Sequence, residues 1–253
     1  MLKKWETMTR EQLKSAADAG SVVVVTIGAM EQHGPHLPVH TDNVIMTTIG
    51  EASVTKASAH IPVVLGPHIP FGYSPHHFLY AGAISLSVET LLQLLKDVVE
   101  SVIKSGFKKI FLLNSHGGNG EIIRIAMKDL HEQYSTHYIG AASYWEVAQD
   151  TLTVFKEKND VFDVGHAGQF ETSIMMAVEE QYVDLVKLQK GDPNRQEVAL
   201  EFPAYVLLTP NNIWETMDGF SDDPTLATKQ FGERIIQIVS DEVSNILQLF
   251  YER

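Results

Sequence analysis

The sequence predicts a layered α/β fold with a largely parallel central sheet. Two short runs of β-branched or apolar residues, 21–30 (SVVVVTIGAM) and 108–116 (KKIFLLNSH), end in polar loops, as buried parallel strands do. Amphipathic stretches with apolar residues three or four apart separate such runs and are typical of helices. Strands that alternate with helices favour a sheet covered by helices.

The elements follow in order along the chain. Thr9 and Gln12 are spaced as a capping box, which predicts an N-terminal helix. Further strands are expected at 61–67 and 137–145, and further helices at 119–134, 171–180 and 225–250. The helix predicted at 87–106 ends at Gly106, where a C-terminal cap belongs, and its apolar stripe consists of Leu91, Leu94, Leu95, Val98, Val99 and Val102.

No repeat or linker divides the chain, so residues 1–253 are interpreted as one domain. The least regular part, 190–224, is expected to be an ordered excursion that packs over the domain or a neighbouring subunit. An apolar patch there would mark a subunit interface, and its candidate members are Phe202, Tyr205, Val206, Leu207, Leu208 and Trp214.

Composition narrows the function. The formal net charge of −13 argues against nucleic acid, whose binding needs Lys and Arg against phosphates. No stretch reaches the ~18 apolar residues of a membrane span, and the first residues lack the apolar block of a signal peptide. Cysteine is absent, which excludes disulfides and thiolate ligands. We therefore expect a cytoplasmic protein with a small-molecule substrate and neither nucleic acid nor membrane as partner.

Potential metal ligands follow both of the clearest strands. Glu31, His33 and Asp42 follow the first strand, and His116 follows the second. The carboxyl ends of strands are where ligands bind in open α/β sheets. Carboxylates mixed with imidazoles suit Zn²⁺, Mn²⁺ or Fe²⁺ better than Ca²⁺. A single carboxylate can bridge two ions ~3.5–4 Å apart, and Asp42 is central among the candidates.

The second of these loops, SHGGNG, is rich in glycine. Gly117 and Gly118 let the backbone approach an ion or a substrate closely. Asn119 is expected to cap the following helix, which would leave amides near the site for an oxyanion. Ser115 does not stand in the G-x-S-x-G pattern of a nucleophile elbow.

A third segment, DVGHAGQFETS, joins the site only as a hypothesis. His166 and Glu171 lie five residues apart across the start of a helix. His166 could act as a base, an acid or an oxyanion partner, and Glu171 could be a metal ligand or hold one in place.

Other histidines and tryptophans are more easily explained without a function. Isolated histidines are usually satisfied polar residues, and those interpreted in this way are His60, His131 and His137. His36 and His40 lie in the metal loop, but loops tolerate histidine. Trp145 and Trp214 are more typical of core packing than of substrate platforms.

Together, GAMEQHGPHLPVHTDN, LLNSHGGNG and HAGQFETS resemble the creatininase family over about residues 5–245. The resemblance implies a three-layer α/β/α fold, two divalent metal ions per chain, hydrolysis of C–N bonds and homo-hexamers. It implies that Glu31 and His116 hold one ion, that His33 holds the other and that Asp42 bridges them. His166 would match a catalytic histidine, and Glu171 an acidic site residue that serves in catalysis or completes the second metal shell.

Two departures from the family pattern bear on the substrate. Creatininases carry a metal-binding glutamate where this chain has Gly118, and residues 72–85 keep His77 but replace the family's Glu with His76. Ala81 and Ala83 stand there for Pro and Thr. We therefore expect creatinine to be a poor substrate. The candidate substrate contacts are His77, Ser115, Gly117, Gly118, Asn119 and Trp145.

The leading interpretation is a metal-dependent amidohydrolase that cleaves a non-peptide C–N bond of a small molecule, a cyclic amide or a formamide. Two alternatives remain. One is a family peptidase that acts on a cofactor precursor, and the other is a non-enzymatic metal-binding or assembly protein that keeps the fold.

Overall fold

A computed structural model describes residues 2–159, 164–191 and 213–253. Its centre is one sheet of four parallel strands in the order β2-β1-β3-β4. The strands are β1 (Val22–Ile27), β2 (Val63–Ile69), β3 (Lys109–Asn114) and β4 (Tyr138–Ser143). Every residue of β1 is buried, which confirms the prediction of a parallel sheet covered on both faces.

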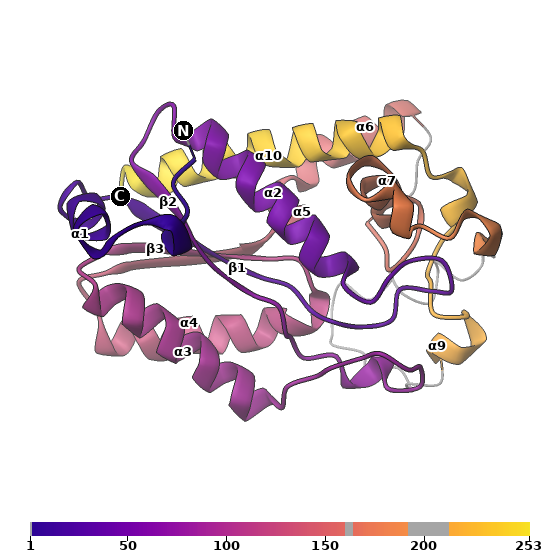
Figure 1. Cartoon of the computed structure of the whole chain (residues 1–253), viewed down its shortest axis with the longest axis horizontal. Helices are drawn as coiled ribbons and strands as arrows, with labels where there is room; N and C mark the ends of the chain where they lie inside the picture. The colour runs from indigo at the N-terminus through magenta and orange to yellow at the C-terminus, as the bar shows by residue number, and fades with distance from the viewer. Residues whose placement is uncertain (1, 160–163, 192–212) are drawn as a thin grey trace.

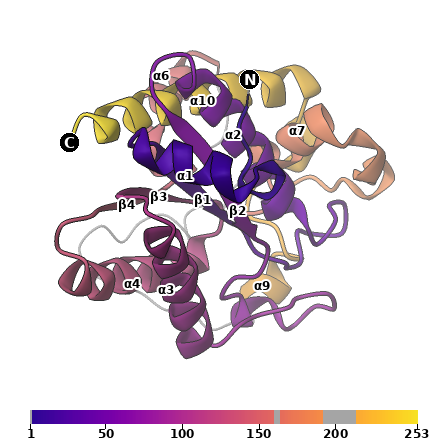
Figure 2. The same ribbon diagram turned by 60° about the vertical axis from the view of Figure 1, so that its left-hand side comes forward.

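Helices cover both faces of the sheet, so the molecule has three layers (Figures 1 and 2). The α-helices are α1 (Arg10–Asp18), α2 (Thr41–Ala57), α3 (Val88–Lys104), α4 (Gly120–Gln133), α5 (Tyr144–Val147), α6 (Gln149–Asn159), α7 (Gln169–Val178), α9 (Ile213–Thr216) and α10 (Lys229–Tyr251). Short 3₁₀ turns are η1 (Trp5–Thr7), η2 (Pro75–His77), η3 (Gly117–Asn119), η4 (Glu180–Tyr182), η5 (Leu185–Lys187) and η7 (Pro224–Leu226).

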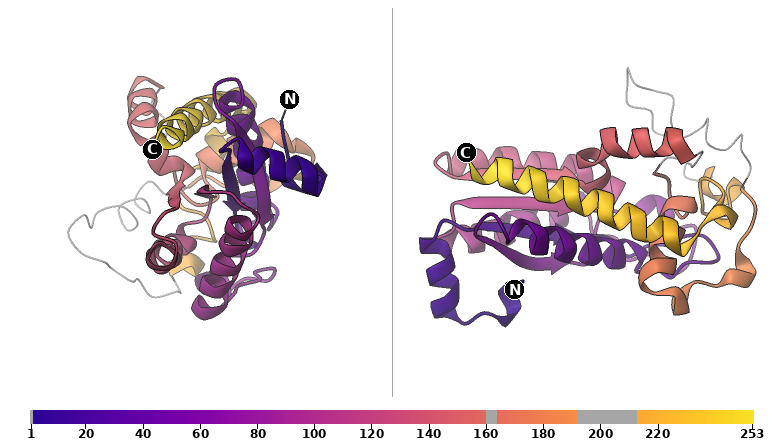
Figure 3. Two further views of the ribbon diagram at one scale, coloured as in Figure 1. Left: turned by 90° about the vertical axis from the view of Figure 1, so that its left-hand side faces the viewer. Right: turned by 90° about the horizontal axis from the view of Figure 1, so that it is seen from above.

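The alternation of side chains along β1 builds two cores. Val22 and Val24 face the layer of α2, α5, α7 and α10, and Val23 and Val25 face α1, α3 and α4. Seen from above, α10 runs along the sheet from the α7 end to the C-terminus (Figure 3). The carboxyl ends of β1 and β3 therefore open toward α7 and α9, away from the C-terminus (Figure 1).

The local signals in the sequence are confirmed where the chain carries a clear cap. Thr9 and Gln12 form the capping box of α1. Gly106 follows the C-cap of α3 with a φ of 97°, a conformation that favours glycine. Asn119 precedes α4, but its side chain makes no capping hydrogen bond, so that expectation is wrong.

Four helices were not predicted, the longer α2 and α6 and the four-residue α5 and α9. Helix α2 packs between the sheet, α7 and α10, and most of its residues are buried. Its buried side also carries polar residues such as Asp42, Asn43 and Ser53, so the sequence lacks the apolar stripe that reveals a helix. Helix α6 was also missed.

Most of 190–224, including Phe202, Tyr205, Val206, Leu207 and Leu208, lies outside the described residues. Within the described ranges, no helix has the length and apolarity that crossing a bilayer requires.

Candidate metal centre

Three segments bring carboxylates and imidazoles together at the carboxyl ends of β1 and β3. The loop after β1 supplies Glu31 and His33, and the loop after β3 supplies His116. Asp42 lies in the first turn of α2, and Glu171 lies in the first turn of α7. All five side chains are buried, with at most 5% of any residue exposed. The structure thus places the five candidate ligands in one buried cluster.

The ligand atoms form two groups that share Asp42. Glu31, Asp42 and His116 offer three atoms within 4.8 Å of one another, and so do His33, Asp42 and Glu171. Asp42 Oδ2 lies 3.5 Å from His116 Nδ1, and Asp42 Oδ1 lies 3.6 Å from His33 Nε2. The two oxygens of Asp42 therefore face different groups, as the oxygens of a bridging carboxylate do.

The groups fit divalent ions. His116 Nδ1 lies 3.2 Å from Glu31 Oε1, and His33 Nε2 lies 3.6 Å from Glu171 Oε2. Two ligands about 2 Å from one tetrahedral ion lie roughly 3.3 Å apart. Among the described residues, nothing forms a hydrogen bond with either carboxylate oxygen of Glu31, with His33 Nε2 or with Asp42 Oδ2. Buried polar atoms without partners are expected where a cation completes the site.

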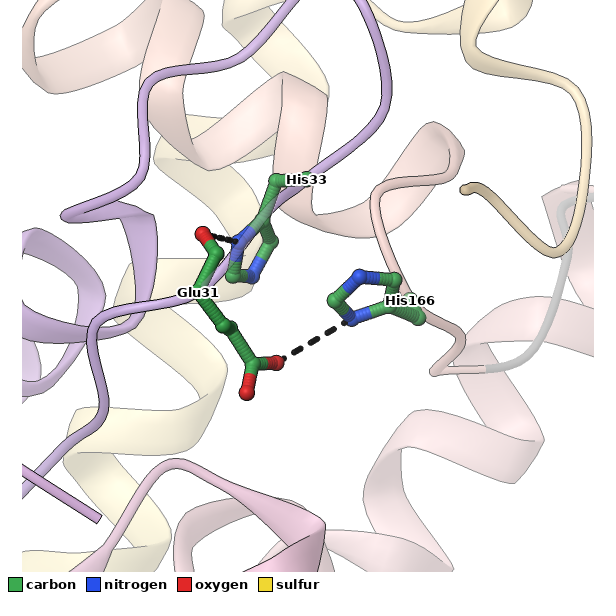
Figure 4. A group of neighbouring side chains, drawn as sticks. All are labelled: Glu31, His33 and His166. Carbon is green, nitrogen blue, oxygen red and sulfur yellow. Dashed lines mark hydrogen bonds and ion pairs between the residues drawn. The ribbon is translucent and has the colours of Figure 1, made fainter. Parts of the chain in front are cut away.

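Outer contacts orient both imidazoles toward these groups. His116 Nε2 lies 3.0 Å from the carbonyl oxygen of Tyr73 and donates to it, which leaves Nδ1 free to face Glu31. His33 Nδ1 lies 3.2 Å from the carbonyl oxygen of Glu31 and donates to it, which leaves Nε2 free (Figure 4). Metal-binding histidines in proteins have this second hydrogen bond almost without exception.

The charges of the cluster are strongly coupled. Burial opposes protonation of His33, but the carboxylates of Asp42 and Glu171 outweigh it and raise the pKa of His33 to about 10. Burial raises the pKa of Glu171 to about 7. The carboxylates that hold a proton on His33 also attract a cation, and a metal ion displaces that proton when it binds.

His166 precedes α7 and faces Glu31, with its Nδ1 3.6 Å from Glu31 Oε1 (Figure 4). Its loop is held by Ser221, which accepts from the backbone N–H of His166 at 2.8 Å. Burial, reinforced by the charge of His33, lowers the pKa of His166 well below its usual range. The site therefore holds His166 as a neutral imidazole.

A cavity of about 330 Å³ opens onto the cluster. Of the predicted substrate contacts, it is lined by His77, Ser115, Gly117, Gly118 and Trp145. Asn119, the remaining predicted substrate contact, does not line this cavity. Its side chain is fully buried, donates to the carbonyl oxygen of Gly28 and accepts from the backbone N–H of Tyr73, so it braces the loop instead of lining the cavity.

The sequence interpretation named neither Trp214 nor Gln32 as a residue of this site, and it expected His76 only to bear on the substrate. Trp214, expected in a core, lines the cavity, and its ring centre lies 4.9 Å from that of His77 and 5.0 Å from that of His166. His76 lines the cavity beside His77. Gln32, between two ligands in the chain, touches both His77 and His166. Only the position of Gln32 between Glu31 and His33 in the chain could have pointed to it.

The backbone at Gly118 leaves no room for a side chain, which accounts for a glycine where the family pattern has a glutamate. A substitution there tests this account. A Cβ there would lie 2.2 Å from the carbonyl oxygen of Tyr73 and 2.5 Å from His116 Nε2. Gly118→Ala should displace His116 and weaken metal binding by about the 10–100-fold typical of losing an outer contact. A Cβ on Gly117 meets nothing within 4 Å, so Gly117→Ala is the matched control. Zinc titration measures both, and equal affinities would contradict this account.

Comparison with known proteins places the chain beside one set of enzymes. A family profile described as creatininase, creatinine amidohydrolase, matches residues 6–247. A mycofactocin precursor peptide peptidase of Mycobacterium ulcerans is 30% identical over 95% of this chain and 89% of its own. A creatinine amidohydrolase of Pseudomonas putida is 23% identical over 95% and 94%. A solved structure described as creatininase Mn superposes over 100% of both chains, with a TM-score of 0.82 and 21% identity.

Proposed function

The chain belongs to the creatininase family of hydrolases, and we propose that it cleaves a C–N bond of a small cyclic amide or formamide at a centre of two divalent metal ions. The observation that carries the proposal is the pair of three-residue groups that share Asp42. Zinc, manganese or iron suits this mixture of carboxylates and imidazoles. A catalytic cavity of about 330 Å³ beside the groups is of the size that small ligands occupy.

Each ion would be held by three side chains, and Asp42 would contact both ions. Glu31, His116 and Asp42 would hold one ion, and His33, Glu171 and Asp42 would hold the other. When bound, such ions polarise a substrate carbonyl and lower the pKa of water towards ~7. With three side chains for each ion, coordination positions stay open for water and substrate, as a catalytic site requires.

His166 is the proposed proton-transfer group. Its Nε2 donates to the carbonyl oxygen of Gln32 at 2.8 Å, so Nδ1 has the free lone pair and faces the centre. As water forms the new C–O bond, Nδ1 accepts its proton and then delivers it to the nitrogen that leaves when the C–N bond breaks. Such a step typically contributes ~10²–10⁴-fold to the rate.

A panel of substrates tests this function. Metal-loaded protein is incubated with formamides, lactams, hydantoin-like rings and creatinine, and formation of the deformylated or ring-opened product is measured. We expect turnover within the panel, with creatinine much slower than the best member, because Gly118 and His76 replace glutamates of the family pattern. Creatinine turnover equal to the best member would contradict that specificity, and no turnover by any member would contradict the function.

A peptide substrate is the second candidate. It is favoured by the 30% identity to a relative named as a precursor peptide peptidase. Short peptides in the same panel distinguish the two, since only this candidate expects a peptide to be hydrolysed faster than every formamide, lactam and ring.

We also propose that the chain works in the cytoplasm as a homo-hexamer. The assembly is supported by the family resemblance, and the cytoplasmic location by the absence of cysteine from the sequence.

A further inference from the structure

Gln32 lies between the ligands Glu31 and His33, and 6% of it is exposed. Its Oε1 accepts from the backbone N–H of Gly34 at 2.9 Å. That bond identifies the two ends of the amide, because only the oxygen can accept and only the nitrogen can donate. The Nε2 end of Gln32 is therefore a donor directed toward the histidines of the site.

The donor end of Gln32 has more neighbours than hydrogens. Nε2 lies 2.8 Å from His77 Nδ1, 3.1 Å from the carbonyl oxygen of Gly219 and 3.1 Å from His166 Nε2. His166 Nε2 is itself a donor, because it lies 2.8 Å from the carbonyl oxygen of Gln32. An amide nitrogen has two hydrogens. They therefore go to His77 and Gly219, and the contact with His166 joins two donors.

This assignment of the Gln32 hydrogens means that His77 and His166 are protonated on different sides of the site. His77 accepts at Nδ1, so the proton of the neutral ring is on Nε2, 3.3 Å from Glu31 Oε1. His166 donates from Nε2, so its lone pair is on Nδ1, 3.6 Å from the same oxygen (Figure 4). One carboxylate oxygen of the centre thus has a donor on one side and an acceptor on the other.

We infer that Gln32 is a positioning residue that makes His77 a hydrogen-bond donor and His166 a proton acceptor toward the reacting atoms. The inference rests on the proposed function for the reaction it serves, but the tautomers are a property of the protein alone. His77, although grouped with Glu31 and His76 by distance, then serves the substrate oxygen instead of a third ion. A fixed donor near the carbonyl stabilises the negative charge that develops there.

Nitrogen-15 spectra of histidine-labelled, zinc-loaded protein test the tautomers without a substrate. The signals are assigned by loss in His77→Gln and His166→Gln. In unaltered protein, the spectra should show His77 protonated at Nε2 and not at Nδ1. Gln32→Glu has nearly the same shape but accepts where the amide donates, so Nδ1 of His77 should become protonated. The ring of His166 is the internal control and should not change, because its partner is the backbone carbonyl of Gln32.

The same spectra can also contradict the inference. Protonation of His77 at Nδ1 in unaltered protein, or an unprotonated Nδ1 in Gln32→Glu, would overturn the inference. Gln32→Met keeps the length of the side chain without a donor and is the second variant if Gln32→Glu folds poorly. It should give signals of both His77 tautomers, whereas a single Nε2-protonated signal would show that Gln32 does not set the tautomer.

A double-mutant cycle separates positioning from mere packing. With the best substrate of the panel, Gln32→Glu should lower kcat by about 10²-fold, with KM and metal content little changed. In a His77→Gln background, whose amide has its own N–H donor, the same change should cost only about threefold. Equal factors in both backgrounds would assign Gln32 a structural role. If no substrate is hydrolysed, the proposed function fails, while the spectra still decide the inference.

Discussion

Asp42→Ala is expected to remove both metal ions from the chain. The two carboxylate oxygens of Asp42 face different groups, at 3.6 Å from His33 Nε2 and 3.5 Å from His116 Nδ1. Its loss leaves each ion two protein ligands. The affinity for zinc should therefore fall by more than the ~10–100-fold typical of losing an outer contact, and turnover should be lost with it. Elemental analysis after reconstitution and removal of free metal measures the change.

Two further variants make this result specific. Asp97→Ala removes an exposed carboxylate on α3 and should leave both ions in place. His33→Ala affects only one group and should remove mainly one ion. If Asp42→Ala retains as much zinc as Asp97→Ala, Asp42 is not a bridging ligand.

His166→Ala is expected to keep the metal ions and to lower turnover by about 10²-fold or more. Each ion has three other protein ligands in the proposed arrangement, and the free Nδ1 of His166 is available for a proton. Metal content and kcat are measured on the same preparation, with the best substrate of the panel. His131→Ala, an exposed residue of α4, is the control and should change neither.

The two measurements separate the alternatives for His166. Loss of metal together with activity would make it a ligand, which its position near Glu31 and His33 also allows. Full metal content with an undiminished rate would remove it from the mechanism. Only retained metal with a reduced kcat agrees with proton transfer.

The fold could be predicted for those elements whose burial produces a regular pattern of apolar residues in the sequence. Strand β1 is a run of mostly β-branched residues, β3 has an apolar centre and α3 has a clear apolar stripe, so these elements could be predicted. Helix α2 packs against the sheet, α7 and α10, but its buried side mixes polar residues with apolar ones, so it has no apolar stripe to detect. Asp42 was consequently expected in a loop, whereas it lies in the first turn of that helix.

The candidate site was predictable only in part for a similar reason. Glu31, His33 and His116 follow strands, and parallel strands bring their carboxyl ends together. No such rule connects α7 or α9 to the sheet, so His166 entered only as a hypothesis and Trp214 was assigned to the core. Gln32 is informative only through its hydrogen bonds, which no spacing in the sequence reveals.

The metal content of the unaltered chain tests the central claim most directly. Protein is reconstituted separately with Zn²⁺, Mn²⁺ and Fe²⁺, freed of unbound metal and analysed for metal per chain. The shared carboxylate and the two groups around it predict close to two ions per chain with at least one of these metals. Fewer than about half an ion per chain with all three would contradict a metal centre of this kind.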